Sequence, residues 1–315
     1  MKIIFKNINP FNDKSKNSTI EFLIQKILAF IILYLLSAVI LELIIIAIFL
    51  FFGFDVLVGQ MPIGEWVNRI PFYGMAGFAF FTICYIKMVE KRKLSDIGIK
   101  LNVKLPIVIA KGIITGAGMV TIMIGILMAS GLCSYQSISK FSVSSCLLWF
   151  LAYFIQSSAE EIMCRGFLLT SLNRRLNTKW AIFISSFAFA IPHVFTILEI
   201  EGITKWVAIL NLLLVSWLFS IVMIKENSLG AACGVHFGWN FCLGTIYGLE
   251  VSGGSSTSGI LKFAIKPNFD FFTGGIYGIE ASILIIPILC ISIAFYTLLI
   301  IRKDKIWNSK KNCLN

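Results

Sequence analysis

Two adjacent glutamates lie in a long apolar run and are followed by an arginine. The stretch SAEEIMCRGF, residues 157–166, carries Glu160, Glu161 and Arg165 between CLLWFLAYFI and FLLTSL. An ionisable group in a membrane span is costly and by default marks a functional site with a nearby partner. Glu161 and Arg165 are four residues apart on one predicted helix, so they can pair. Glu160 points away from that pair, which makes it the carboxylate that is free for proton chemistry.

The chain has two histidines, and both lie in apolar segments. His193 occurs in SSFAFAIPHV, where Pro192 disrupts the helix and frees backbone groups that need polar partners. His236 occurs in CGVHFGWNF, and Asn240 follows four residues later on the same helix face. One such histidine would be explained by packing. Because both histidines of the chain lie at membrane depth, a shared chemical site is favoured.

These residue types could catalyse hydrolysis by two routes. In the first, a glutamate and a histidine activate a water as general base and later protonate a leaving amine, while an asparagine and a second histidine stabilise the oxyanion. In the second, two histidines and a carboxylate hold zinc and leave one position open for water. The zinc ligands would then be His193, His236 and Glu160. The chain contains no HExxH motif, so the soluble metalloprotease pattern is absent.

The composition indicates a polytopic membrane protein. Of the 315 residues, 58% are hydrophobic and 14% are charged, with a mean hydropathy of +0.89. A soluble domain carries nearer a quarter charged residues. No polar stretch is long enough for a separate soluble domain, so we expect a single membrane domain over residues 1–315. The net charge of +11 does not indicate nucleic acid, because the basic residues punctuate the apolar segments as membrane topology requires.

Eight apolar segments are long enough to predict membrane helices, and the fold class is therefore an all-α bundle with about eight transmembrane helices. With eight crossings, both termini lie on the same side of the membrane. The connections on that side hold most of the Lys and Arg residues, and basic connections face the cytoplasm, so we expect both termini to be cytoplasmic. The pattern GIITG at 112–116 is typical of close helix packing. The predicted segments are 24–53, 71–89, 105–130, 145–171, 179–198, 205–224, 228–249 and 274–301.

The predicted topology also gives a depth for each ionisable group. Counting from the nearest cytoplasmic basic residue at 1.5 Å per residue, Glu160, His193 and His236 all lie about 17 to 21 Å into the membrane. Three groups from three helices therefore fall in nearly one layer. Such a layer needs a water-filled cavity, so we expect one shared site.

Three stretches of the sequence resemble the motifs of one family. EEIMCR at 160–165, FAIPH at 189–193 and HFGWN at 236–240 are similar to the EExxxR, FxxxH and HxxxN/D motifs of the CPBP membrane proteins. That family contains the CAAX prenyl endopeptidases of the Rce1 type and the bacterial Abi proteins linked to bacteriocin self-immunity. All three motifs occur in order on successive predicted helices, and the resemblance covers residues 145–245, which we expect to be the catalytic core.

The resemblance implies a role for each matched residue. Glu160 would activate water together with His193, and Glu161 and Arg165 would be the supporting pair. His236 and Asn240 would stabilise the oxyanion. The family was long described as metalloproteases, whereas a metal-independent glutamate mechanism is now favoured, so the resemblance implies no required cofactor. Zinc stays open as the alternative, because both routes use the same residues.

The predicted function is that of an intramembrane endopeptidase, similar to a CAAX protease, that hydrolyses a membrane-associated peptide or protein. Its surroundings would be membrane lipid, and no nucleic acid is expected as a partner. The Lys- and Ile-rich composition suggests a bacterial source, hence the bacterial cytoplasmic membrane and a substrate that is not literally a prenylated CAAX protein. One alternative is a non-proteolytic bacteriocin-immunity or scaffold protein. A proton-coupled transporter is a third hypothesis, which the absence of repeat symmetry disfavours.

Overall fold

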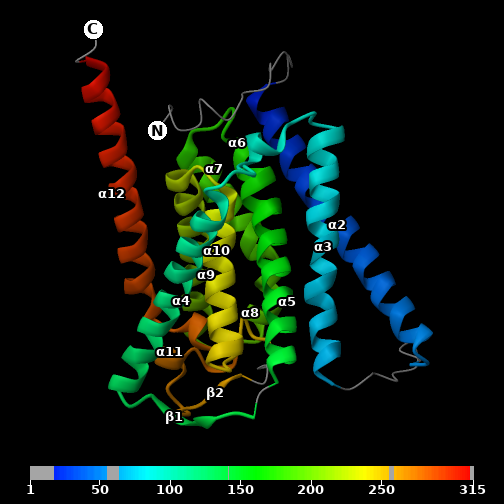
Figure 1. Cartoon of the computed structure of the whole chain (residues 1–315), viewed down its shortest axis with the longest axis vertical. Coiled ribbons are helices and arrows are strands. Elements are labelled where there is room, and N and C mark those ends of the chain that lie inside the picture. The colour runs from blue at the N-terminus through cyan, green and yellow to red at the C-terminus, as the bar shows by residue number, and fades with distance from the viewer. Residues whose placement is uncertain (1–17, 55–63, 141, 255–258, 313–315) are drawn as a thin grey trace.

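The computed structural model describes residues 18–54, 64–140, 142–254 and 259–312, which form a helical bundle (Figure 1). The all-α fold predicted for this membrane protein is confirmed. The long helices are α2 (Thr19–Phe51), α3 (Glu65–Met88), α4 (Leu105–Ala129), α5 (Val143–Glu161), α7 (Thr178–Ala190), α9 (Thr204–Glu226), α10 (Leu229–Phe241) and α12 (Ile285–Asn312).

Short helical elements complete the bundle and extend two of its long helices. A π-helical segment continues α5, and another continues α10, without a break in the helical path. Such π-helical turns are rare and frequently occur at functional sites. The α-helical pieces are α6 (Thr170–Leu172), α8 (Val194–Leu198) and α11 (Asp270–Thr273). The others are π-helical at Ile162–Leu169 and Cys242–Ile246, and 3-10 helical at Leu94–Ile97, Ile191–His193, Gly275–Tyr277 and Ile279–Ala281.

Local chemistry explains where several helices begin and end. Ser18 and Glu21 form a capping box at the start of α2, in which each side chain accepts a hydrogen bond from the other residue's backbone N–H. Helix α9 ends at Glu226, because the next residue, Asn227, has a φ of 51° in the left-handed region that asparagine tolerates. Helix α7 ends at Ala190, just before Pro192, and the chain continues as a 3-10 turn.

Six helical stretches among the described residues are long and apolar enough to cross a membrane. Two of the eight predicted crossings, 145–171 and 228–249, fall outside that set. Helix α10 is only 13 residues long without its π-helical extension, and α5 carries the polar Gln156 and Glu160. Both nevertheless run alongside the other helices through the bundle (Figure 1). The six stretches are Thr19–Phe51, Trp66–Met88, Leu105–Ala129, Thr178–Leu198, Thr204–Glu226 and Ile285–Arg302.

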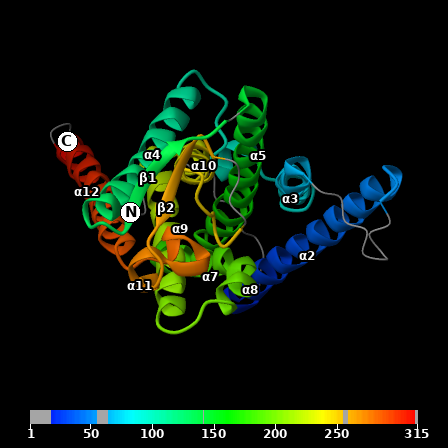
Figure 2. The same ribbon diagram turned by 90° about the horizontal axis from the view of Figure 1, so that it is seen from below.

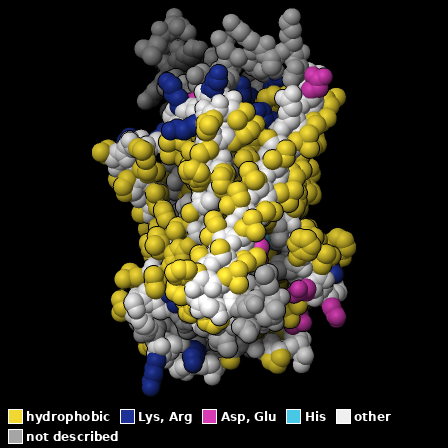
Figure 3. Space-filling model, turned by 90° about the vertical axis from the view of Figure 1, so that its right-hand side faces the viewer, with side chains coloured by type: hydrophobic (Ala, Val, Ile, Leu, Met, Phe, Trp, Pro, Cys, Tyr) yellow, Lys and Arg dark blue, Asp and Glu magenta, His cyan; other side chains and the backbone are white. Residues whose placement is uncertain are grey.

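The arrangement of the helix ends agrees with the predicted topology. Helix α2 begins, and α12 ends, at the same end of the bundle (Figure 1). On the face shown in Figure 3, hydrophobic side chains cover the middle of the molecule and most of the visible Lys and Arg side chains gather at that end. The positive-inside rule predicts that such a basic end faces the cytoplasm. The predicted cytoplasmic placement of the termini themselves concerns residues 1–17 and 313–315, which lie outside the described part of the chain.

Helix α10 lies at the centre of the bundle and packs against α4, α5 and α9 (Figure 2). Its contact with α4 is close because glycines face one another. Gly112 and Gly116 on α4 lie against the backbone of α10, and Gly234 and Gly238 on α10 lie against the backbone of α4. Small residues at such positions allow two helix backbones to approach, as the GIITG pattern predicted. This contact fixes the helix that carries His236 and Asn240.

The contact between α4 and α10 predicts that Gly116→Ala destabilises the protein by about 1–3 kcal/mol. A Cβ atom at Gly116 would overlap the backbone of Val235 and lie 2.7 Å from the backbone nitrogen of Trp239, and backbone atoms cannot rotate away. Thermal unfolding of the purified protein in detergent measures the effect. Gly118→Ala on the same helix is the matched control, because a Cβ there meets nothing within 4 Å. Equal melting temperatures for the two variants would contradict this account of the packing.

The described part of the chain contains one small sheet that was not predicted. Strands β1 (Cys133–Ile138) and β2 (Leu261–Ile265) pair in the antiparallel sense, with Cys133 opposite Ile265 and Ile138 opposite Leu261. The ladder is irregular between Tyr135 and Ser137. The sheet lies at the end of the bundle opposite the end where α2 begins and α12 ends (Figure 1). Pairing between segments so far apart in the chain leaves no periodic signal in either segment, so apolarity alone could not reveal it.

The last predicted segment, 274–301, begins too early. Helix α12 starts at Ile285, and the 3-10 turns Gly275–Tyr277 and Ile279–Ala281 stand before it instead. Three glycines account for the difference: Gly274, Gly275 and Gly278 have φ values of 88°, 58° and 85°. These left-handed conformations are open to glycine and interrupt a helix. The segment of turns brings Glu280 against α9 and α10.

Candidate active site

Glu161 and Arg165 form a buried ion pair at the junction of α5 and its π-helical extension. Arg165 Nη1 donates to Glu161 Oε1 at 2.9 Å, and neither side chain is exposed. Arg165 Nη2 also donates to the backbone oxygen of Ser216 on α9, at 2.9 Å. The guanidinium lies over the rings of Phe189 and Phe219, at 4.5 and 5.3 Å from their centroids. The pair therefore cancels its own charge and joins α5 to α7 and α9.

His236 lies between the two glutamates. Its Nδ1 is 3.1 Å from Glu161 Oε1, and its Nε2 is 3.7 Å from Glu160 Oε2. An ionised carboxylate only accepts hydrogen bonds, so Nδ1 carries a proton and donates to Glu161. The distance of 3.7 Å is too long for a direct hydrogen bond, and it leaves Nε2 and Glu160 side by side. The ring of Phe219 stacks on the imidazole with centroids 4.8 Å apart and holds its plane.

A glutamine links Glu160 to Asn240. Gln156 lies one helical turn before Glu160, and its Nε2 donates to Glu160 Oε1 at 2.6 Å. Asn240 Nδ2 donates in turn to Gln156 Oε1 at 3.0 Å. These two bonds orient both amides, because each uses one nitrogen donor and one oxygen acceptor. Glu160 is thereby held in place from α5, and Asn240 is held from α10.

His193 occupies the 3-10 turn that follows α7. Its Nδ1 is 3.2 Å from the backbone oxygen of Phe189. A carbonyl oxygen only accepts, so Nδ1 is the donor and Nε2 of the neutral ring keeps its lone pair. The ring of Phe189 lies between the two histidines, with centroids 5.3 Å from His193 and 5.8 Å from His236. Within the described residues, no ion pair joins His193 to Glu160.

A cavity of about 100 Å³ brings most of these polar groups together. It has room for several waters, since one water needs about 10–15 Å³ by this measure. The cavity offers space for water beside both histidines and Asn240, whereas Glu160 is not among the residues that line it. Aromatic and aliphatic side chains form the rest of its wall. The polar side chains that line it are Gln156, His193, His236, Asn240, Ser252 and Glu280.

The described residues contain no group of three His, Cys, Asp or Glu side chains arranged to hold a metal ion. In particular, His193, His236 and Glu160, the set considered for zinc, do not gather in that way. His236 instead directs Nδ1 to the Glu161 carboxylate, and His193 directs Nδ1 to a backbone oxygen. In this arrangement, the described residues do not form the three-ligand set that the zinc route needs.

Two residues of the site were missed in the sequence. Gln156 is a polar residue four positions before Glu160 on an apolar helix, and this spacing alone places it on the same face. Glu280 lies within a segment predicted as a membrane helix, where a carboxylate should itself have marked a site. Its partners come from α10 and from the loop at Ser252, so no local pattern around residue 280 could indicate them.

Comparison with known families matches residues 142–242 to the model of Type II CAAX prenyl endopeptidase Rce1-like. The match covers about a third of the chain and includes Glu160, Glu161, Arg165, His193, His236 and Asn240. Comparisons with curated proteins and with solved structures found no match. The predicted resemblance to the CPBP proteins of the Rce1 type is confirmed over this segment. Over this third of the chain, the similarity is to a family of CAAX prenyl endopeptidases.

Proposed function

We propose that the protein hydrolyses a peptide bond of a membrane-associated peptide or protein, with Glu160 as the general base. The observation that carries the proposal is the convergence of Glu160 and His236 beside a cavity that His193 and Asn240 also line. Glu161 and Arg165 neutralise each other next to this site, which leaves Glu160 as the glutamate of the EEIMCR stretch that is free to accept a proton.

The proposed reaction begins with a water in the cavity. Glu160 takes one proton of the water while its oxygen forms a bond to the substrate carbonyl carbon. His193, through the free lone pair on Nε2, accepts a hydrogen bond that orients the water. Asn240 donates from Nδ2 to the oxyanion, and His236 donates from Nε2 when its ring carries a second proton. The proton on Glu160 then passes to the nitrogen of the leaving amine as the C–N bond breaks, giving a carboxylic acid, which keeps the second proton of the water, and an amine.

A cleavage assay of histidine variants tests these roles. We expect His193→Ala and His236→Ala each to lower the cleavage rate by about 10²–10⁴-fold, because each removes a group that acts on the water or the oxyanion. The protein is reconstituted in vesicles with membrane-anchored peptides, and products are followed by mass spectrometry. Gel filtration in detergent shows whether each variant is folded. Wild-type rates in either folded variant would contradict the assigned role.

The same assay separates the remaining mechanisms. The proposal expects a chelator to leave the wild-type rate unchanged, whereas loss of cleavage restored by added zinc would replace it with the zinc route. Peptide binding without cleavage by the folded wild type would contradict proteolysis. That outcome would favour a scaffold or immunity protein, which binds a partner without hydrolysing it.

A further inference from the structure

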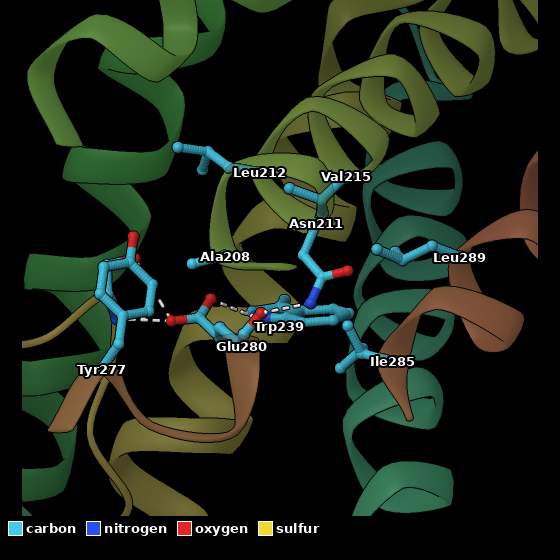
Figure 4. A pocket seen from close by; sticks show the side chains of 10 residues that line it. Ala208, Asn211, Leu212, Val215, Trp239, Tyr277, Glu280, Ile285 and Leu289 are labelled. Atoms are coloured by element: carbon cyan, nitrogen blue, oxygen red, sulfur yellow. Dashed lines mark hydrogen bonds between the residues drawn. The ribbon is translucent and has the colours of Figure 1, made fainter. Parts of the chain in front are cut away.

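Glu280 is a carboxylate outside the three motifs and outside the matched segment. It lies on the 3-10 turn Ile279–Ala281, before the crossing formed by α12. Its Oε1 accepts from Trp239 Nε1 at 2.8 Å, and its Oε2 accepts from the backbone N–H and the hydroxyl of Ser252. Its backbone oxygen accepts from Asn211 on α9, at 2.9 Å. Figure 4 shows the side chain between Tyr277 and Trp239. These bonds fix the carboxylate in place.

The fixed carboxylate lines the cavity of the candidate active site. Glu280 lines it together with His193 and Trp239, and Trp239 directly precedes Asn240 on α10. Four aromatic side chains face this cavity together with the carboxylate. They are Phe72, Phe189, Phe219 and Trp239.

The carboxylate lacks a permanent counter-charge. No Lys or Arg lines the cavity in the described part of the chain, and the nearby Arg165 is already paired with Glu161. His193 is the ionisable group that faces Glu280 with opposite sign when protonated. Burial raises the pKa of the Glu280 carboxyl, and the hydrogen bonds from Ser252 and Trp239 oppose this rise. A desolvated carboxylate of this kind gains most from a cation brought by a ligand.

The carboxylate also has an acceptor position to spare. A carboxylate offers about four acceptor sites, and three donors occupy Glu280, so Oε1 can accept one more hydrogen bond. A carboxylate next to aromatic faces is the environment that binds ammonium and guanidinium groups, through a charge-assisted hydrogen bond and cation–π contacts. A cavity of about 100 Å³ admits the end of one side chain.

We propose that Glu280 makes this cavity select substrates that place an ammonium or guanidinium group next to the peptide bond to be cleaved. This inference rests on the proposed function, because it assumes that the bound peptide is then cleaved. Selection of a cation is nevertheless a binding property, which can be measured without cleavage. Trp239 connects the Glu280 carboxylate to the proposed oxyanion site, because its Nε1 donates a hydrogen bond to Glu280 and it directly precedes Asn240.

The test compares matched peptides on wild type, Glu280→Gln and Glu250→Gln. The probes are palmitoylated Gly-Ser-Ala peptides in phosphatidylcholine vesicles, with one Lys moved position by position, and the same set with norleucine. We expect wild type to favour Lys over norleucine by at least about tenfold at one position, as one charge-assisted hydrogen bond allows. Glu280→Gln should lose that ratio. Glu250→Gln should keep the ratio, since Glu250 lies in a neighbouring loop outside the cavity wall.

Binding is measured separately in Glu160→Gln, so that the peptide is not consumed. A Lys preference in binding, without cleavage by wild type, would support cation selection and contradict the proposed function. Cleavage by wild type at equal rates for Lys and norleucine at every position would overturn cation selection and leave the proposed function in place. This second comparison needs no variant, so it holds even if Glu280→Gln does not fold.

Discussion

Replacing Glu160 by glutamine lowers kcat by at least about a hundredfold, because a neutral amide cannot take a proton from the attacking water. Glutamine preserves the size of the side chain, and its oxygen can still accept the hydrogen bond from Gln156. We expect KM to change little, since the lost interaction is made in the transition state. The measurement is kcat and KM for a membrane-anchored peptide that the wild type cleaves.

Another glutamate in a membrane helix provides the control. Glu42 lies on α2 and is exposed, away from the cavity, so Glu42→Gln should keep the wild-type kcat. Glu160→Asp retains a carboxylate on a side chain one methylene shorter, and its rate should fall between those of wild type and Glu160→Gln. Cleavage by Glu160→Gln at the wild-type rate would show that another group activates the water.

Replacing Arg165 by methionine destabilises the protein by about 3–5 kcal/mol, the usual cost of removing one partner of a buried ion pair. Glu161 would remain fully buried without its cation, and Ser216 would lose its donor. The same change removes the guanidinium that lies over Phe189 and Phe219. The free energy of unfolding, measured by titration with denaturing detergent, quantifies the loss.

A double replacement distinguishes the pair from either residue alone. Glu161→Leu with Arg165→Met removes both charges, so we expect it to cost less than Arg165→Met alone. Lys111→Met is the control for loss of a cation, because Lys111 is exposed on α4. An unchanged stability in Arg165→Met, or a double variant as unstable as the sum of the two single changes, would contradict a coupled buried pair.

Spacing along single helices was sufficient to predict part of the site. The four-residue separation of Glu161 and Arg165 corresponds to the observed ion pair. Each of the eight predicted segments overlaps one long helix of the described residues, of which six stretches qualify as candidate membrane spans. The glycine pattern at 112–116 predicted close helix packing, and its partner in the structure is α10. These features depend on local periodicity, which a sequence displays directly. The functions assigned to the motif residues remain predictions.

Contacts between distant segments could not be predicted in the same way. Apolarity favoured a single helix over 274–301, but glycines with left-handed backbone place Glu280 in a turn beside α10. The pairing of β1 with β2 also joins distant segments, so local periodicity could not predict it. Depth alone also grouped Glu160 with both histidines, whereas the structure brings only His236 next to the two glutamates. Equal depth sets a layer, and the rotation of each helix about its axis decides which side chains meet.

The central claim is that this chain breaks peptide bonds with Glu160, and product analysis tests it most directly. Purified wild type and Glu160→Gln are reconstituted in parallel vesicles with the same membrane-anchored peptides. Mass spectrometry then searches for two fragments whose summed mass exceeds that of the intact peptide by one water. The account predicts such a fragment pair with wild type and a yield at least about a hundredfold lower with Glu160→Gln. Equal yields from both proteins, or no fragment pair from a folded wild type on any peptide, would contradict it.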